Sequence, residues 1–69
     1  MKEIKINTNT IQLDQFLKWI NVVSSGGEAK ILIKEGHVQV NNTLEQKRSR
    51  KLIIGDKIKV DEKVYIIIQ

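Results

Sequence analysis

The chain has 69 residues, and its 12 Lys or Arg against 8 Asp or Glu give a net charge of +4 at pH 7. A chain this short holds one domain, which we expect to span residues 1–69. No cysteine and a single histidine are present, so disulfides and thiolate metal sites are excluded and a structural zinc site is disfavoured. The lack of a long apolar run and of a signal-peptide pattern predicts a cytoplasmic protein without a membrane partner.

The N-terminal third of the chain predicts a strand followed by a helix. Residues 2–6 alternate polar and apolar side chains, which is the period of a half-buried strand. Residues 7–10 have the composition of a turn, and a helix is expected from about Ile11 to about Asn21. The apolar face of this helix, with the spacing i, i+3, i+4, i+7, consists of Leu13, Phe16, Leu17 and Ile20.

A second short helix is predicted by its two ends. Ser25 and Glu28 have the spacing of a capping box, in which each side chain bonds a backbone amide of the first turn. Ala29, Leu32 and Ile33 would face the core, and Gly36 suits the left-handed position that ends a helix. A helix of about ten residues is marginal alone, so packing must stabilise it.

The C-terminal half predicts short antiparallel strands. Residues 37–40 and 57–60 alternate, and Asn41-Asn42 suits a tight hairpin turn because asparagine tolerates a positive φ. Residues 64–68 are the most apolar strand, which we expect to be paired on both sides, with the N-terminal strand as one partner. The expected fold class is therefore α+β, with two short packed helices against a small, mostly antiparallel sheet.

Two groups of polar residues are candidates for binding an anion. Ser25-Gly26 at a helix start offers free amides, and Lys30, Lys34, His37 and Gln39 could form one polar stripe beside it. Residues 47–51 hold four further cations, which are Lys47, Arg48, Arg50 and Lys51. Each group has an ordinary alternative, namely a helix cap for the first and a solvated surface for the second.

Other features of the sequence narrow the function. The single histidine has no neighbouring nucleophile, so we predict no catalytic residues and no enzyme activity. Three aromatic residues are too few for a platform that stacks bases, so any nucleic acid would be read by shape and backbone. Trp19 and Ile31 fall off the inner faces of their helices; we expect them to cover each other or the core edge, the alternative being an exposed apolar contact site.

An ordered series of short motifs runs through the chain: Leu13-Asp14-x-Phe16-Leu17, Ser24-Ser25-x-x-Glu28-Ala29-Lys30, Ile33-Lys34-Glu35-Gly36-x-Val38-x-Val40-Asn41 and Gly55-Asp56-x-Ile58. This series, over about residues 12–60, resembles the RNA-binding domain of the ribosomal small-subunit protein S-four type, also called the alpha-L RNA-binding motif. Three further segments are Gln15-Phe16-Leu17-Lys18, Ser25-Gly26-Gly27-x-Ala29-Lys30 and Lys47-Arg48-Ser49-Arg50-Lys51-Leu52. With them the chain is more similar still to short stand-alone bacterial members of the YaaA/YbcJ type.

The resemblance implies that the second helix and the following strand face structured RNA. Residues carried over to this face are Ser25, Gly26, Lys30, Lys34, His37 and Gln39, flanked by Lys47, Arg48, Arg50 and Lys51. Gln12 and Gly26 stand where many members of the family have a cation, and His37 replaces a common lysine. These departures remove cations from the helix start, so residues 47–51 become the stronger candidates for contact with RNA.

Together these observations predict a non-enzymatic, monomeric module that binds structured RNA. Ribosomal RNA is the first candidate target, and ribosomal proteins are candidates for further partners. No cofactor and no metal is expected. One alternative is a protein-interaction adaptor that uses Trp19, Ile31 and the cations of residues 47–51. Another is non-specific binding to DNA. RNA binding should weaken steeply with salt, whereas an apolar protein contact should be less sensitive.

Overall fold

The computed structural model describes residues 1–69 and shows two short helices against a mixed sheet. Helix α1 comprises Leu13–Trp19 and helix α2 comprises Gly26–Lys34. The strands in chain order are β1 (Lys2–Lys5), β2 (Thr10–Gln12), β3 (Val38–Val40), β4 (Thr43–Leu44), β5 (Lys51–Ile53), β6 (Lys57–Val60) and β7 (Lys63–Ile68). Neither helix is long and apolar enough to cross a membrane. The predicted α+β class is confirmed.

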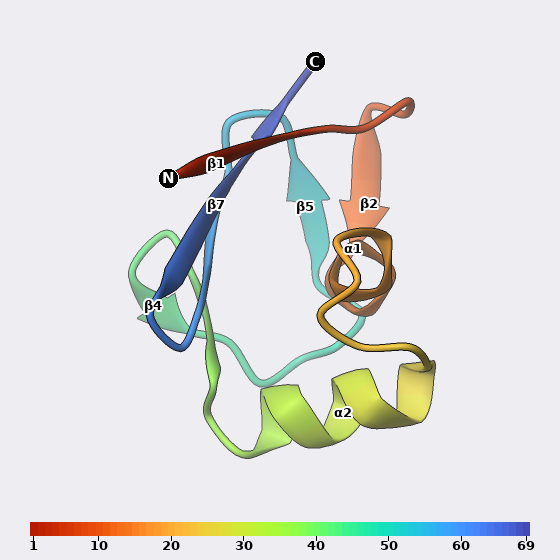
Figure 1. The fold of residues 1–69 in the computed structure, drawn as a ribbon, viewed down its shortest axis with the longest axis vertical. Helices are drawn as coiled ribbons and strands as arrows, with labels where there is room; N and C mark the ends of the chain where they lie inside the picture. Colours follow the sequence, from red (N-terminus) through yellow and green to blue (C-terminus); the bar gives the residue numbers. More distant parts are fainter.

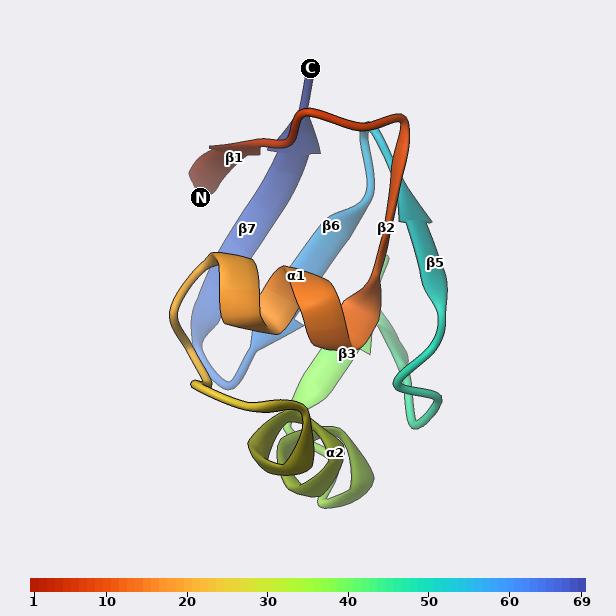
Figure 2. The ribbon, with the colours of Figure 1, turned by 90° about the vertical axis from the view of Figure 1, so that its right-hand side faces the viewer.

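Five of the strands form one sheet in the order β1-β7-β6-β3-β4 (Figure 1). All its pairings are antiparallel except that of β1 with β7, which is parallel. Strand β7 therefore lies between β1 and β6, as predicted for the most apolar strand. Strands β2 and β5 form a separate antiparallel ribbon, which Figure 2 shows beside α1.

The hydrophobic core lies between the helices and the inner face of the five-stranded sheet. Strands β3, β6 and β7 turn alternate residues towards it, and both helices contribute their predicted apolar faces. The Phe16 and Tyr65 rings meet edge to face, with centroids 6.4 Å apart. Full burial of a large apolar side chain stabilises a fold by about 1.5–3 kcal/mol. This core fixes α1 and α2 relative to the sheet and so fixes the surface described below.

Helix α2 has the ends that the sequence predicts. The Ser25 hydroxyl accepts a hydrogen bond from the Glu28 amide at 3.2 Å. Gly36 has a φ of +85° and ends the helical segment in the left-handed conformation. One detail of the capping box differs, because the Glu28 carboxylate accepts from the amide and hydroxyl of Ser24 instead of the amide of Ser25.

The predicted boundaries of α1 are wrong by two residues at each end. Ile11 and Gln12 belong to β2, because they pair with Leu52 and Lys51 of β5. The helix ends at Trp19, and Asn21 takes a φ of +61°, which turns the chain out of the helical conformation. A local apolar pattern cannot reveal that residues 10–12 have a strand partner 40 positions further along the chain.

The β3–β4 hairpin confirms another local prediction. Asn41 and Asn42 both have positive φ values, +53° and +70°, as a tight two-residue turn requires. The turn places β4 antiparallel to β3, and the chain then leaves the sheet at residue 45. The hairpin therefore determines where the cationic segment begins.

The main expectation for Trp19 and Ile31 is wrong. Their exposed fractions are 52% and 59%, so neither side chain is covered by the other. The Trp19 indole nitrogen donates a hydrogen bond to the backbone oxygen of Lys5, 3.2 Å away on β1. Ile31 lies elsewhere on the surface, where it lines a shallow depression together with residues of the α1–α2 connection. Both side chains therefore present apolar surface to solvent.

Candidate nucleic-acid interface

The cationic segment predicted from the sequence lies in an ordered loop that hydrogen bonds hold in place. We call it the basic loop (residues 45–51). Two of its carbonyl oxygens cap the start of α1: the Leu13 amide donates to the Arg50 oxygen at 2.8 Å, and the Asp14 amide donates to the Arg48 oxygen at 3.0 Å. Gln12, at the N-cap position of α1, provides no side-chain cap. The first amides of a helix need partners outside it, so the basic loop and α1 hold each other in place.

The side-chain carboxylate of Glu45 connects the two ends of the basic loop by hydrogen bonds. One oxygen of Glu45 accepts from the amides of Gln46 and Lys47, both at 3.1 Å. The other accepts from the Arg50 guanidinium at 2.6 Å. The hydrogen bond from Arg50 is the main reason that the pKa of Glu45 lies below its ordinary value. The basic loop is therefore an ordered part of the fold, and its exposed cations are solvated.

Arg50 thus differs from the other cations of the loop. Its side chain is 40% exposed, and its guanidinium is bonded to Glu45, whereas Lys47, Arg48 and Lys51 are exposed and form no ion pair. Lys51 opens β5, where it lies opposite Gln12 of β2. The loop therefore offers three free cations on a backbone that is fixed at both ends.

Helix α2 has two flanks of opposite charge. Lys30 and Lys34 are one turn apart and exposed, and neither forms an ion pair. Glu28, Ile31 and Glu35 recur at the same kind of spacing on the other flank, where they line a shallow depression with the α1–α2 connection. The core-facing side between the two flanks carries Ala29 and Ile33.

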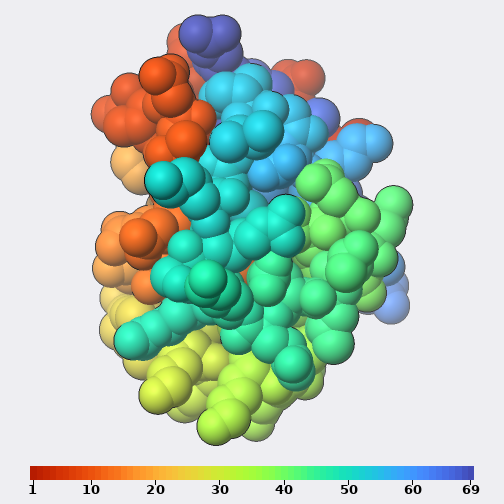
Figure 3. All heavy atoms as spheres, turned by 180° about the vertical axis from the view of Figure 1, so that it is seen from behind, coloured from red at the N-terminus to blue at the C-terminus, as the bar shows by residue number.

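The basic flank of α2 is turned towards the basic loop. In Figure 2 the α1–α2 connection lies on one side of α2 and the basic loop on the other. Since the acidic flank lines the depression beside that connection, Lys30 and Lys34 face the loop side. Figure 3 shows this face, with the basic loop in turquoise between the orange start of α1 and the yellow-green α2. Five free cations therefore gather on one face: Lys30, Lys34, Lys47, Arg48 and Lys51.

The start of α2 is less suited to an anion than the sequence suggests. The Ser25 hydroxyl is occupied by the Glu28 amide, and the Glu28 carboxylate lies at the same helix end. Hydrogen bonds from the side chain and backbone of Ser24 lower the pKa of Glu28, so this carboxylate stays negative and repels a phosphate there. Gly26 is open to solvent, because a Cβ added to it would meet no atom within 4 Å.

The structure separates His37 from Lys30 and Lys34. Its Nδ1 lies 2.7 Å from a carboxylate oxygen of Asp61, and its Nε2 lies 3.9 Å from that of Glu35. The ring belongs to the depression beside the acidic flank of α2. His37 therefore links the end of α2 to the β6–β7 turn, and its two carboxylate neighbours make a poor surrounding for a phosphate.

Gln39 lies on another surface again. Val38 and Val40 on either side of it are buried in the core, so Gln39 points to the outer face of the sheet, away from the helices. Its cross-strand neighbours there are Leu44 and Lys59. Of the residues predicted for the interface, the structure brings together the lysines of α2 and the cations of the basic loop, but not His37 and Gln39.

Glu45 is not among the residues that the sequence predicts for the interface. A carboxylate directly before a cationic segment looks like an ordinary surface residue, and no local pattern indicates that it accepts three hydrogen bonds. The available signal was the spacing of Glu45 and Arg50, which bracket the segment with opposite charges. No three His, Asp or Glu side chains gather in a way that could hold a metal ion.

Several known folds share this architecture. The chain superposes on the solution structure of YbcJ from E. coli with a TM-score of 0.73 and 24% identity, covering 100% of this chain and 89% of YbcJ. That structure is described as an alfaL motif involved in RNA-binding. A pseudouridylate synthase gives a TM-score of 0.72 at 18% identity, over 78% of this chain and 23% of the synthase. The 30S ribosomal protein S4e of Thermoplasma acidophilum gives 0.65 at 16%, over 87% of this chain and 32% of S4e. These likenesses concern the fold.

Sequence comparison adds a closer relationship. The chain is 43% identical over 58 residues to the "Probable ribosome maturation protein RlbA" of Bacillus subtilis (strain 168), which covers 84% of this chain and 82% of that protein. The sequence model of the S4 domain matches residues 4–68. This match extends beyond the motifs at residues 12–60 and includes all of β7 and the second half of β1. The chain therefore belongs to the S4 domain family.

Proposed function

We propose that this protein is a non-enzymatic module that binds structured RNA, with ribosomal RNA as the first candidate. The observation that carries the proposal is the set of five free cations on one face, three of them on a loop fixed to both α1 and the sheet. Phosphate contacts from lysine and arginine supply most of the affinity for a nucleic acid. A rigid array of cations suits a partner whose phosphates are also held in fixed positions.

Four further observations support RNA over other polyanions. The chain belongs to the S4 domain family, its relative carries a ribosome maturation name, and the similar YbcJ fold is described as RNA-binding. The cationic face has no aromatic side chain to stack a splayed base, which favours recognition of RNA shape and backbone. A ribosomal partner would place the protein in the cytoplasm.

A direct binding experiment tests this function. A labelled hairpin fragment of ribosomal RNA, an unstructured RNA of equal length and a DNA duplex are titrated with the protein at several salt concentrations. We expect the hairpin to bind most tightly and its affinity to fall steeply with salt. Equal affinity for the three nucleic acids would leave only non-specific charge attraction and would overturn the proposal.

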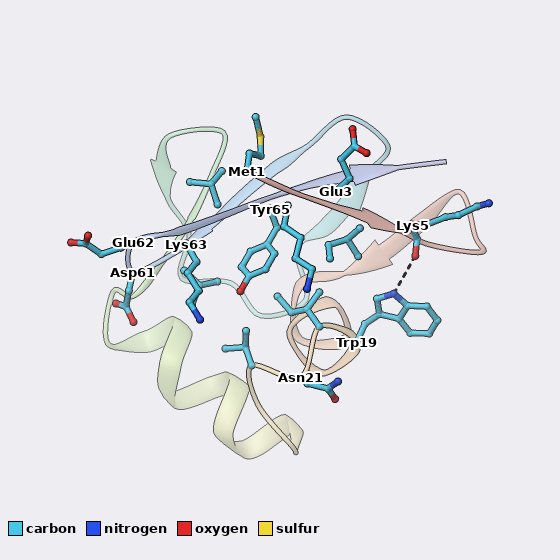
Figure 4. A pocket seen from close by; sticks show the side chains of 15 residues that line it. Met1, Glu3, Lys5, Trp19, Asn21, Asp61, Glu62, Lys63 and Tyr65 are labelled. Carbon is cyan, nitrogen blue, oxygen red and sulfur yellow. Dashed lines mark hydrogen bonds between the residues drawn. The ribbon is translucent and has the colours of Figure 1, made fainter.

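The adaptor function is favoured by one observation, the groove of Figure 4. This groove lies between the C-terminal end of α1 and strands β1 and β7, with Tyr65 in its centre and Trp19 at one end. It lies at the opposite end of α1 from the basic loop, which caps the first turn of that helix. If the protein works as an adaptor that docks a partner protein in this groove, Trp19→Ala will remove its adaptor activity in cells without changing its affinity for RNA.

A further inference from the structure

Glu45 is a carboxylate at the start of the basic loop, which belongs to the proposed RNA-binding face. Its side chain is only 16% exposed, and both of its oxygens point into the basic loop. Its own amide donates to the Val38 oxygen at 3.1 Å, which fixes its backbone to the end of β3. The residue is therefore held by the sheet and directed towards the loop, not towards solvent.

The three hydrogen bonds of this carboxylate connect the two ends of the loop. Those from Gln46 and Lys47 hold its first residues, and that from Arg50 holds its last. Between them the Arg50 amide donates to the Lys47 oxygen at 3.1 Å and closes a turn. Without the carboxylate, two amides and a guanidinium lose their acceptor at once, and nothing else in the structure bonds these groups.

The same bonds determine where the free cations lie. Arg48 lies inside the turn that the hydrogen bond from the Arg50 amide to the Lys47 oxygen closes, and its backbone oxygen caps α1. The backbone of Lys47 is held by the hydrogen bond that its amide donates to the Glu45 carboxylate. Binding that must first order a flexible loop loses affinity to conformational entropy, whereas a preorganised loop does not.

We propose that Glu45 is a positioning residue that preorganises the basic loop for structured RNA. The proposal rests on the RNA-binding function proposed above and adds a residue of opposite charge to it. It has a distinctive consequence. By charge alone, removal of a carboxylate from this face strengthens RNA binding; through loss of the loop's conformation, the same change weakens it. The two effects have opposite signs.

Preorganisation also has a consequence for selectivity. A fixed array of cations matches the fixed phosphates of a folded RNA, whereas an unstructured strand can adapt to either a rigid or a flexible loop. Loss of Glu45 should therefore weaken binding of the hairpin more than binding of the single strand. A general loss of folded protein would reduce both affinities by the same factor, so this ratio reports positioning specifically.

The experiment compares Glu45→Gln with Glu62→Gln. Both changes remove one negative charge, but Glu62 is an exposed residue of the β6–β7 turn without a hydrogen bond to the basic loop. The probes are the ribosomal hairpin and the unstructured RNA at one salt concentration. We expect Glu45→Gln to weaken hairpin binding about tenfold and to lower the preference for the hairpin, while Glu62→Gln binds as well as the parent protein or better.

Two further measurements keep the test decisive. Arg50→Lys keeps the net charge but removes the guanidinium, so it should also weaken hairpin binding while the protein stays folded. Amide exchange by NMR should show faster exchange at Gln46 and Lys47 in Glu45→Ala, which lacks both acceptor oxygens, with the β3–β6 amides unchanged. If Glu45→Gln binds the hairpin as tightly as Glu62→Gln does, the positioning role is overturned. If alanine at Lys47 and Arg48 has no effect either, the proposed RNA face itself is wrong.

Discussion

Removal of the free cations of the basic loop is the most direct test of the interface. The variant Lys47→Ala, Arg48→Ala, Lys51→Ala deletes three charges that form no ion pair in the folded protein. It leaves the Glu45–Arg50 pair and the backbone caps of α1 in place. The fold should therefore survive, because exposed side chains of this kind contribute little to stability.

The expected magnitude follows from counterion release. Each phosphate contact contributes about 0.7–0.9 to the slope of log affinity against log salt, so three lost contacts should flatten that slope by about 2 to 3. Because this contribution vanishes near 1 M salt, the loss of affinity at about 0.1 M should be roughly two orders of magnitude. Fluorescence anisotropy of a labelled ribosomal hairpin over a salt series measures both quantities.

A matched variant separates the site from net charge. Lys57→Ala, Lys59→Ala, Lys63→Ala also removes three exposed lysines, from β6 and β7. Lys57 and Lys59 are on the outer face of the sheet, since the alternate residues Ile58 and Val60 are buried. This control should lose little affinity and keep nearly the parent slope. Equal losses in the two triple variants would show that the basic loop has no special role.

Four further predictions follow from the same geometry. Lys30→Glu and Lys34→Glu should each weaken hairpin binding while the melting temperature stays near that of the parent; unchanged binding in both would remove α2 from the interface. Ser25→Ala should cost about 1 kcal/mol of stability through loss of the helix cap, visible as a melting temperature lower by about 4–8 °C. Gly26→Arg should fit without strain and strengthen hairpin binding by adding a cation where none stands now. Glu45 has a lowered pKa in the folded protein, so the stability it contributes is present above its unfolded pKa of about 4.3 and is lost as the pH falls through the folded value. Glu45→Gln should therefore be less stable than the parent at about pH 6, and chemical denaturation should show the difference shrinking below about pH 4.

The sequence by itself determined the elements whose causes are local. The Ser25 cap and Gly36 define α2 because each acts within one helical turn of its own position. Asn41 and Asn42 define the β3–β4 turn because the required positive φ is a property of those residues. The apolar alternation of β3 and β6 likewise predicts which of their side chains are buried. The motifs around these elements were sufficient to indicate the family.

Tertiary structure alone decided how the candidate interface is assembled. Ile11 and Gln12 are strand residues because β5 pairs with them, and α1 begins where the carbonyls of the basic loop cap it. His37 leaves the interface because Asp61, 24 positions away, holds its ring. Hydrogen bonds and pairings between distant segments leave no periodic trace in either segment. The cations could therefore be recognised in the sequence, but whether each is free, paired or turned away depends on partners that only folding brings together.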